Sequence, residues 1–369
     1  MPVATRADRE RFVRLPWRIY ANDPAWVPPL LLERRGFVDP AKHPFYEFGA
    51  AKMFLAVRDG ADVGRVLVAD DPRDIGGCGP NSGVFGMFET LDDQAIADAL
   101  LNTAREWLRS RGRVRMFGPI DYSMNYSCGL LVDGFDTPPR LMMNHNPPYY
   151  AGLLSRAGAE KAKDLIAWWI DLKRDLGEWR TRVERLTARG RVTLRSFRQD
   201  RLPQEIAHCK EIYHRSWREN WGFTPMTDAE YVDMARQVAA WARPELMLMA
   251  EVDGAPIGFS MTMPDLNEAM RPLNGKLFNY GLPIGYLRFA WRAKRVDAAR
   301  MLVLGVLPEF RRRGVAEALI LRSFDVGNQL GYRGAELSWT LEDNVLINRS
   351  IQAVGGKSYK TYRIFRIEF

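Results

Sequence analysis

The chain contains few of the residues from which disulfide frameworks and metal sites are built. Only three cysteines, Cys78, Cys128 and Cys209, occur among 369 residues, and their positions show no paired spacing. Neither a disulfide framework nor a thiolate metal site is therefore indicated, and we expect a reducing compartment and no bound metal. No apolar stretch of the signal-peptide kind follows the N-terminus, and no run of about 18 apolar residues occurs. These absences predict a cytoplasmic protein without a membrane-spanning helix.

Signals for nucleic-acid recognition are also missing, although the chain is basic. Its formal net charge of +8 favours contact with nucleic acid, an anionic membrane surface or a phosphate-rich cofactor. No aromatic RNA-binding motif and no zinc-finger spacing accompanies the arginines, so no nucleic-acid partner is expected. With 47% hydrophobic and 27% charged residues the composition is that of a folded globular protein. At about 150 residues per domain the length indicates two or three units, and two is our starting expectation.

An internal repeat is the first positive feature. Residues 59–64 (DGADVG) correspond to residues 253–258 (DGAPIG), an offset of 253 − 59 = 194. In both copies an apolar run meets an Asp-Gly pair and a second apolar run follows, which predicts a β-hairpin with a tight turn.

A second repeat lies further along each copy. Residues 86–112 align without gaps to residues 305–331, an offset of 305 − 86 = 219. Their shared apolar positions recur at helical spacing, so each segment is predicted to form a strand, a turn and an amphipathic helix, with another strand after it. We therefore predict an α/β fold with a first domain at 1–175, a linker helix at 176–190 and a second domain at 191–369.

Residues 306–316 (VLPEFRRRGVA) carry the chemistry of the second copy, since they join a predicted strand to a predicted helix. The first turn of a helix presents unpaired N–H groups and the positive end of the helix dipole, which together form an anion site. Gly314 and Ala316 are small enough for a diphosphate to approach the backbone, and the neighbouring arginines add positive charge.

This segment resembles the phosphate-binding turn of the GCN5-related N-acetyltransferase (GNAT) superfamily, V-x-P-x-x-(R/Q)-x-x-G-x-(G/A). Val306, Pro308, Arg311, Gly314 and Ala316 occupy the matching positions. The resemblance implies two tandem GNAT-like domains, each a mixed, mainly antiparallel twisted sheet flanked by helices. It also implies an acyl-CoA cosubstrate with its pyrophosphate at 311–316, its pantetheine along the strand 301–306, and a splayed neighbouring strand at 334–340. The predicted acyl-CoA-binding residues are Leu304, Val306, Arg311, Arg312, Arg313, Gly314, Val315 and Ala316.

The segment after residue 338 resembles the next motif of the family, in which an Asn opens a helix and a Tyr follows seven residues later. Asn344 matches, but Ile351 stands at the position of the Tyr that usually acts as general acid. Tyr359 or Tyr362 could replace it, or a thiolate whose thiol has a pKa of about 8.5 could leave without an acid.

An acceptor amine also requires a base, because an amine with a pKa of about 10 is only about one part in a thousand neutral at pH 7. Glu342 is the first candidate, and its other interpretation is an acidic residue at a helix N-terminus. The predicted catalytic residues are thus Glu342, Tyr359 and Asn344.

The first copy differs at its corresponding turn. Asp92, Asp93, Gln94 and Ala95 replace the three arginines and Gly314. Because acidic side chains repel a diphosphate, the first domain is predicted to lack an acyl-CoA site.

Residues 264–300 form a long insert in which aromatic residues alternate with arginines. It is predicted to contact an anionic membrane surface or cover an apolar tunnel, or alternatively to pack as a lid over the active site. This insert and the segments LPWRIYANDPAWVPPL, VDGFDTPP and NPPYY resemble tandem bacterial N-acyltransferases that acylate sphingoid bases, the bacterial ceramide synthases.

The leading functional hypothesis is therefore an acyl-CoA-dependent N-acyltransferase that acts on a small-molecule or lipid amine, such as a sphingoid base, and gives a ceramide-type amide. The protein would be cytoplasmic, with membrane association at the inner face as a further expectation. Two alternatives remain open: a tRNA-dependent aminoacyl transferase of the tandem GNAT kind, and a non-catalytic CoA-binding sensor or scaffold.

Overall fold

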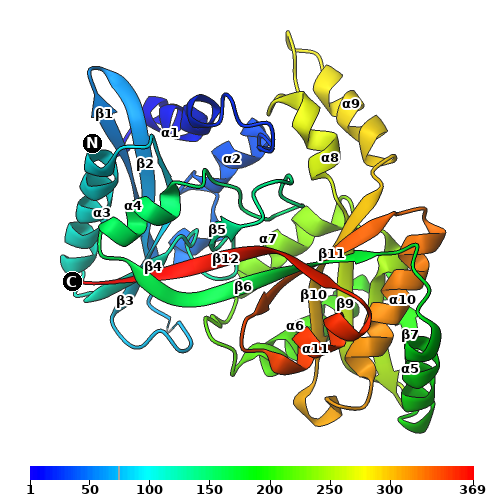
Figure 1. Cartoon of the computed structure of the whole chain (residues 1–369). Coiled ribbons are helices and arrows are strands. Elements are labelled where there is room, and N and C mark those ends of the chain that lie inside the picture. Colours follow the sequence, from blue (N-terminus) through cyan, green and yellow to red (C-terminus); the bar gives the residue numbers. More distant parts are fainter. Residues whose placement is uncertain (74) are drawn as a thin grey trace.

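A single mixed sheet of twelve strands runs through the computed structural model, which describes residues 1–73 and 75–369 (Figure 1). The strands, in spatial order along the sheet, are β1 (Ala50–Arg58), β2 (Ala61–Asp70), β3 (Ser82–Thr90), β4 (Arg115–Gly118), β12 (Lys357–Glu368), β6 (Glu160–Asp171), β11 (Gly334–Leu341), β10 (Ala298–Val306), β9 (Ala255–Pro264), β8 (Met247–Val252) and β7 (Val192–Ser196), and β5 (Leu130–Asp133) pairs with β12 off this path. The predicted α/β class is confirmed.

The internal repeat appears as the same topology used twice. In the first half β1, β2 and β3 are antiparallel, and the helix α3 (Gln94–Arg109) crosses to the parallel strand β4. In the second half β8, β9 and β10 are antiparallel, and α10 (Val315–Gln329) crosses to the parallel strand β11. Both Asp-Gly pairs have positive φ at both residues, 51° and 72° at Asp59–Gly60 and 52° and 80° at Asp253–Gly254. These are the dihedral signs of a type I′ hairpin turn.

The two halves exchange their last strands. α4 (Tyr150–Arg156) leads into β6 in the first half, and α11 (Val345–Ala353) leads into β12 in the second. β6 pairs with β11 of the second half, β12 pairs with β4 of the first half, and β6 and β12 pair with each other. In Figure 1 these two long strands run side by side from one half to the other, and the C-terminus lies beside α3. The boundaries 1–175 and 191–369 stay a prediction, and the helix α5 (Gly177–Arg189) occupies the predicted linker.

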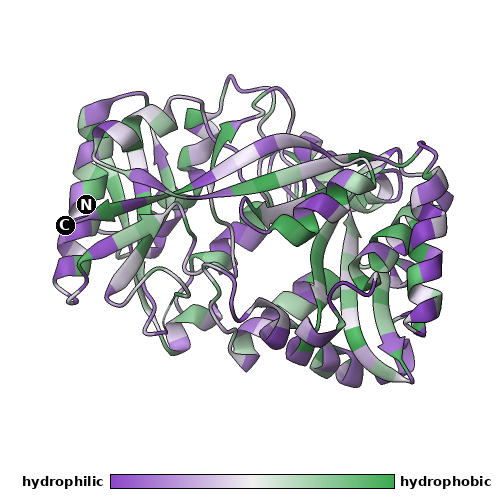
Figure 2. Cartoon of the chain, turned by 60° about the horizontal axis from the view of Figure 1, so that its bottom comes forward, coloured by the Kyte–Doolittle hydropathy of each residue, from purple (hydrophilic) through white to green (hydrophobic). Residues whose placement is uncertain are grey.

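The remaining helices cover the sheet. In Figure 2 hydrophobic (green) and hydrophilic (purple) segments alternate along them, as in amphipathic helices. α3, for example, buries six apolar residues against the first half of the sheet. In the part of the chain that the structure describes, no helix is long and apolar enough to cross a bilayer. The other elements are α1 (Arg6–Ile19), α2 (Leu31–Phe37), η1 (Pro44–Glu47), η2 (Gln199–Arg201), α6 (Leu202–Trp217), α7 (Asp228–Ala239), η3 (Pro244–Leu246), α8 (Asn267–Met270), η4 (Arg271–Leu273), α9 (Ile284–Ala293) and η5 (Pro308–Phe310).

Candidate functional site

The sheet opens between β10 and β11. These parallel strands pair only from Ala298 opposite Gly334 to Met301 opposite Leu337. Beyond Met301, β10 continues to pair with β9 as far as Val306, so its other edge is left free. The opening exposes backbone polar groups of β10 to a space between the strands, as the resemblance implied.

A cavity of about 970 Å³ adjoins this opening, within the range of roughly 300–1,000 Å³ found for ligand sites. β10, β11, α6, α7 and the start of α10 form most of its wall. The first half contributes residues 124–127 and Met142. Between α6, α7 and the strands β8 and β9 the wall is mostly apolar, through Phe197, Ile206, Cys209, Tyr213, Trp217, Tyr231, Met234, Ala235, Val238, Met247, Phe259 and Met261.

The helix α10, which follows the turn after β10, has an N-terminus without a side-chain cap. Arg312 and Gly314 have φ of 67° and 77°, and Gly314 precedes the helix without any side-chain cap. Within residues 1–73 and 75–369, no hydrogen bond is donated by the backbone N–H groups from Arg312 to Glu317. The turn borders the cavity, so these N–H groups and the positive end of the helix dipole face a space that an anion could occupy.

The corresponding turn of the first half is closed. Asp93 caps α3, and its Oδ1 accepts hydrogen bonds from the N–H groups of Ala95 (2.9 Å) and Ile96 (3.3 Å). Its Oδ2 lies 2.7 Å from the guanidinium of Arg58, which lowers the pKa of Asp93. The N–H groups are therefore occupied, and a carboxylate stands where an anion would bind.

The predicted acyl-CoA residues gather at one end of the cavity. All of them line it except Arg313, whose guanidinium carbon lies 4.9 Å from the centre of the Phe310 ring. The Arg311 side chain is oriented by a 2.6 Å hydrogen bond that its Nη2 donates to the carbonyl of Ser216. Their binding role stays a prediction at this point.

The three predicted catalytic residues are not brought together. Asn344 lines the cavity, but Glu342 and Tyr359 do not. Glu342 accepts hydrogen bonds from Lys161 Nζ (2.7 Å) and from the N–H of Asp164 (3.0 Å). Its carboxylate is thus engaged by β6 rather than by the cavity.

A buried polar cluster lies behind the opening, and of its members the sequence had pointed only to Tyr359. Ser338 lines the cavity, and its Oγ donates a hydrogen bond to the fully buried carboxylate of Glu336. Arg300 Nε lies 2.8 Å from Ser338 Oγ and 3.2 Å from Glu336 Oε1, and Tyr359 donates to the other oxygen. Burial lowers the pKa of Arg300, and burial together with the Glu336 charge raises the pKa of Tyr359. The available signal was a charged residue two positions from a serine in the apolar strand GAELSWT, because alternate residues share one face of a strand.

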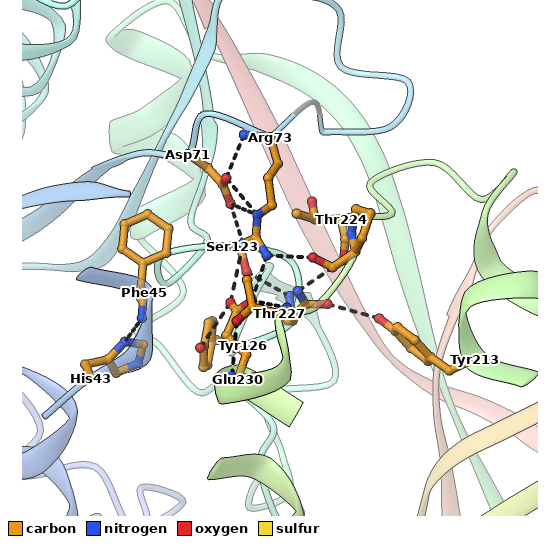
Figure 3. A network of polar contacts seen from close by, with 12 residues as sticks. His43, Phe45, Asp71, Arg73, Ser123, Tyr126, Tyr213, Thr224, Thr227 and Glu230 are labelled. Carbon is orange, nitrogen blue, oxygen red and sulfur yellow. Dashed lines mark hydrogen bonds and ion pairs between the residues drawn. The ribbon is translucent and has the colours of Figure 1, made fainter. Parts of the chain in front are cut away.

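A second polar network fixes the first half against the cavity wall (Figure 3). Arg73 forms ion pairs with Asp71 (2.7 Å) and with Glu230 near the start of α7 (2.6 Å), and both carboxylates are almost fully buried. Tyr126 Oη donates to the same Glu230 at 3.2 Å. Beside it, Asn125 accepts a hydrogen bond from Tyr213 Oη at 3.0 Å. These contacts hold residues of the first half in place at the cavity.

Comparison with other proteins identifies relatives of similar length. A model described as the acetyltransferase (GNAT) family matches residues 206–347. A protein of Caulobacter vibrioides (strain NA1000 / CB15N) named bacterial ceramide synthase is 38% identical, over 99% of this chain and 96% of its own length. Protein YghO of Escherichia coli (strain K12) is 34% identical, over 97% of this chain and 92% of its own length.

Solved structures share the fold. A tandem GNAT protein from the clavulanic acid biosynthesis pathway superposes with a TM-score of 0.57 at 16% identity, covering 100% of this chain and 97% of its own. A GCN5-related N-acetyltransferase from Sphaerobacter thermophilus gives a TM-score of 0.55 at 16% identity, with 99% and 94% coverage.

Proposed function

The chain belongs to the GNAT family of acyltransferases, and from this premise we propose that it transfers a long acyl group from acyl-CoA to the primary amine of a lipid-like acceptor, such as a sphingoid base. The family assignment confirms the resemblance found in the sequence and identifies an N-acyltransferase. The acyl donor, the acceptor and the site residues belong to the proposal.

One observation carries the proposal: the difference between the two matching helix N-termini. α10 begins at a glycine, beside three arginines, and among the described residues its first N–H groups have no hydrogen-bond acceptor. α3 begins at Asp93, whose carboxylate accepts hydrogen bonds from the first N–H groups of that helix. A diphosphate fits the first turn and is repelled by the second. This supports a single acyl-CoA site, with its diphosphate at residues 311–316 and its pantetheine along the free edge of β10.

The apolar part of the cavity supports a long acyl chain. The wall between α6 and α7 is continuous with the opening of the sheet, where the reacting carbon would lie. Each buried methylene contributes about 0.8 kcal/mol, so a wall of this kind favours long donors over acetyl-CoA. The name of the Caulobacter relative supports a sphingoid-base acceptor, with a ceramide-type amide as product.

The chemistry requires a group that takes a proton from the amine. Acyl-CoA supplies a thioester; the amine nitrogen bonds to its carbonyl carbon, and the C–S bond breaks to release the CoA thiolate. The N–H groups on the free edge of β10 are suited to stabilise the developing oxyanion. Ser338 lines the cavity and its Oγ donates to Glu336, so in this proposal Ser338 accepts a proton from the amine while it passes its own to that carboxylate. Glu336 is accordingly our candidate for the base, in place of the outward-facing Glu342.

The experiment that tests the proposal follows free thiol while the protein is incubated with acyl-CoAs of graded length and a panel of amines. We expect release only when both a long acyl-CoA and a lipid amine are present, with an amide as product. CoA binding without thiol release for any amine would contradict the proposal and favour a sensor.

The same substitution, Glu to Gln, made at each of the two candidate residues shows which one acts as the base. Glu336→Gln is expected to reduce kcat by a factor of about 10² to 10⁴, the usual contribution of general base catalysis. Glu342→Gln removes only a partly exposed ion pair with Lys161 and should leave kcat within a few-fold. The reverse pattern would return the role of base to Glu342.

A further inference from the structure

Residues 276–296 form a hairpin-like projection made of a tight loop and α9. In Figure 1 it stands at the top of the molecule, away from the sheet. The projection is held at its base, where the carbonyl of Gly275 accepts a hydrogen bond from the N–H of Leu31 and Trp17 donates to Asn274 at 2.7 Å. None of its residues lines the cavity, in the part of the chain that the structure describes. Its role is therefore to be sought on its outer surface.

One face of α9 is packed. Gly285, Phe289 and Ala293 recur every four residues and are buried. The Phe289 ring lies edge-on to Trp241, with ring centres 4.7 Å apart. The helix is thus fixed to the body of the protein, and the residues between these three are exposed, apart from the half-buried Ala290.

The outward residues are large and apolar. At the loop, Phe278, Tyr280 and Leu282 are 57%, 103% and 58% exposed. On α9, Leu287 and Trp291 are 63% and 56% exposed. Single exposed apolar residues are ordinary, but with Tyr286, which is 47% exposed, six lie within fourteen positions, and a cluster of this size is expected to be covered by a partner.

The charges around this surface all have one sign. Residues 269–296 contain six basic residues and no acidic one. None of these six side chains forms an ion pair with any residue in 1–73 or 75–369, and the guanidinium carbon of Arg295 lies 3.8 Å from the Trp291 ring centre. Elsewhere on the chain arginines regularly pair with carboxylates, as Arg333 does with Asp297 just after the projection. An unpaired basic rim around aromatic residues is complementary to an anionic, amphipathic surface.

We propose that residues 276–296 dock the protein on an anionic phospholipid bilayer. Phe278, Tyr280 and Leu282 enter the interface, where aromatic rings are favoured, and the α9 residues Leu287 and Trp291 lie along it. Arg288, Arg292 and Lys294 contact the lipid phosphates. The opposite, packed face of α9 is linked to the cavity wall, because Phe289 contacts Trp241 and the next residue, Ala242, lines the cavity.

Vesicle co-sedimentation of the full chain tests this, with no substrate present. Vesicles of phosphatidylcholine alone are compared with vesicles containing one third phosphatidylglycerol, at low and high salt. We expect binding to the anionic vesicles that weakens with salt, and at least tenfold weaker binding to the neutral ones, because each basic side chain near an anionic surface contributes about fivefold in affinity.

Two variants, each with a matched control, distinguish the contribution of the apolar residues to membrane binding from that of the basic residues. Phe278→Ser/Tyr280→Ser/Leu282→Ser should reduce binding at least tenfold, while Leu32→Ser/Val57→Ser/Val114→Ser, which changes three exposed apolar residues elsewhere, should not. Arg288→Gln/Arg292→Gln/Lys294→Gln should reduce binding at least tenfold and weaken its salt dependence, because only three of the six basic residues keep their charge. The same charge is removed by Arg6→Gln/Arg189→Gln/Lys357→Gln on exposed positions of α1, α5 and β12, which should bind nearly as the unchanged protein does.

Equal binding to neutral and anionic vesicles, or equal loss in the control variants, would overturn the proposal. So would a dimer in sedimentation equilibrium that the loop variant dissociates, because the surface would then be covered by a second copy. Thiol release from a long-chain acyl-CoA and a sphingoid base, both dispersed in a neutral detergent without vesicles, is measured in parallel. The two assays therefore distinguish a failure of the membrane-docking proposal from a failure of the proposed enzymatic function.

Discussion

Gly314 is the residue on which the proposed diphosphate site depends most. Its φ of 77° lies in the left-handed region, and a Cβ placed there would lie 2.9 Å from the Cβ of Leu186 on α5. Gly314→Ala is therefore expected to displace the turn and raise the KM for acyl-CoA at least tenfold. Steady-state kinetics with graded acyl-CoA concentration measures this.

Gly331 provides the control, because its φ is 86° and nothing lies within 4 Å of an added Cβ. Gly331→Ala should cost about 1–2 kcal/mol of the free energy of unfolding through the same left-handed strain, without a change in KM. If both variants changed KM equally, the effect would be one of stability alone.

His43 is a residue whose burial predicts a pH dependence. Its ring stacks on Tyr122 with centres 4.1 Å apart, and burial, reinforced by the Arg34 charge, lowers its pKa to about 4 from 6.5. Between pH 6.5 and 4 the unfolded chain binds the proton and the folded one does not, so the stability contributed by neutral His43 is lost as pH falls through this window.

Denaturant unfolding at pH 7, 5.5 and 4.5 is expected to show this loss in the unchanged protein and not in His43→Asn, with a difference of up to about 3 kcal/mol. Parallel pH dependence in the two proteins would contradict the assignment.

Residue roles were predictable where they depend on the local chain. The turn at Gly314 follows from one motif. The surroundings of Glu342, which contacts β6, and of the buried Glu336 do not follow from the local chain, because they depend on the nonlocal pairing of β11 with β6 and β10. Glu336 was recognisable only as a charge inside an apolar strand.

Among the elements, α7 forms the wall that limits the apolar end of the cavity. Ala235 lines the cavity, whereas the next residue, Arg236, is exposed and does not. Ala235→Trp should fill space proposed for the acyl chain and lower kcat/KM for the longest acyl-CoA at least tenfold, with little effect on short donors. Arg236→Trp adds the same side chain to the outer face and should leave chain-length preference unchanged. A loss that is independent of acyl length in Ala235→Trp would place the acyl chain elsewhere.

The repeated elements were predictable because each depends on local signals. The Asp-Gly turns and the helices that end before Gly112 and Gly331 follow from turn chemistry and from apolar spacing. The separation of β10 from β11 was predicted from the family resemblance alone, because the periodicity of apolar residues does not distinguish a paired strand edge from a free one.

At the scale of the whole molecule, the exchanged strands make the halves interdependent. β12 lies in the sheet between β4 and β6, so a separated first half would lose a strand that comes from the far end of the chain. A protease site inserted at residues 173–175, after β6, is expected to yield two fragments that co-elute and unfold in one transition. Each fragment expressed alone should be insoluble or unfolded, because it exposes unpaired strand edges. Two independent thermal transitions would show instead that each half folds alone.

The exchange could not be derived from the sequence. The sequence of β6 and that of β12 are each compatible with the last strand of their own half. Pairing within the same half and pairing with the other half would both satisfy their apolar pattern. The domain boundaries stay a prediction, and the strand pairing joins the two GNAT-like halves in one continuous sheet.

Hydrogen–deuterium exchange with a non-hydrolysable acyl-CoA thioether tests the central claim most directly, because it reports on the backbone N–H groups themselves. We predict slower exchange at residues 302–317, from the free edge of β10 to the first turn of α10, and no change at the matching residues 86–97 of the first half. Protection of 86–97, or an unchanged 302–317 at saturating ligand, would contradict the account.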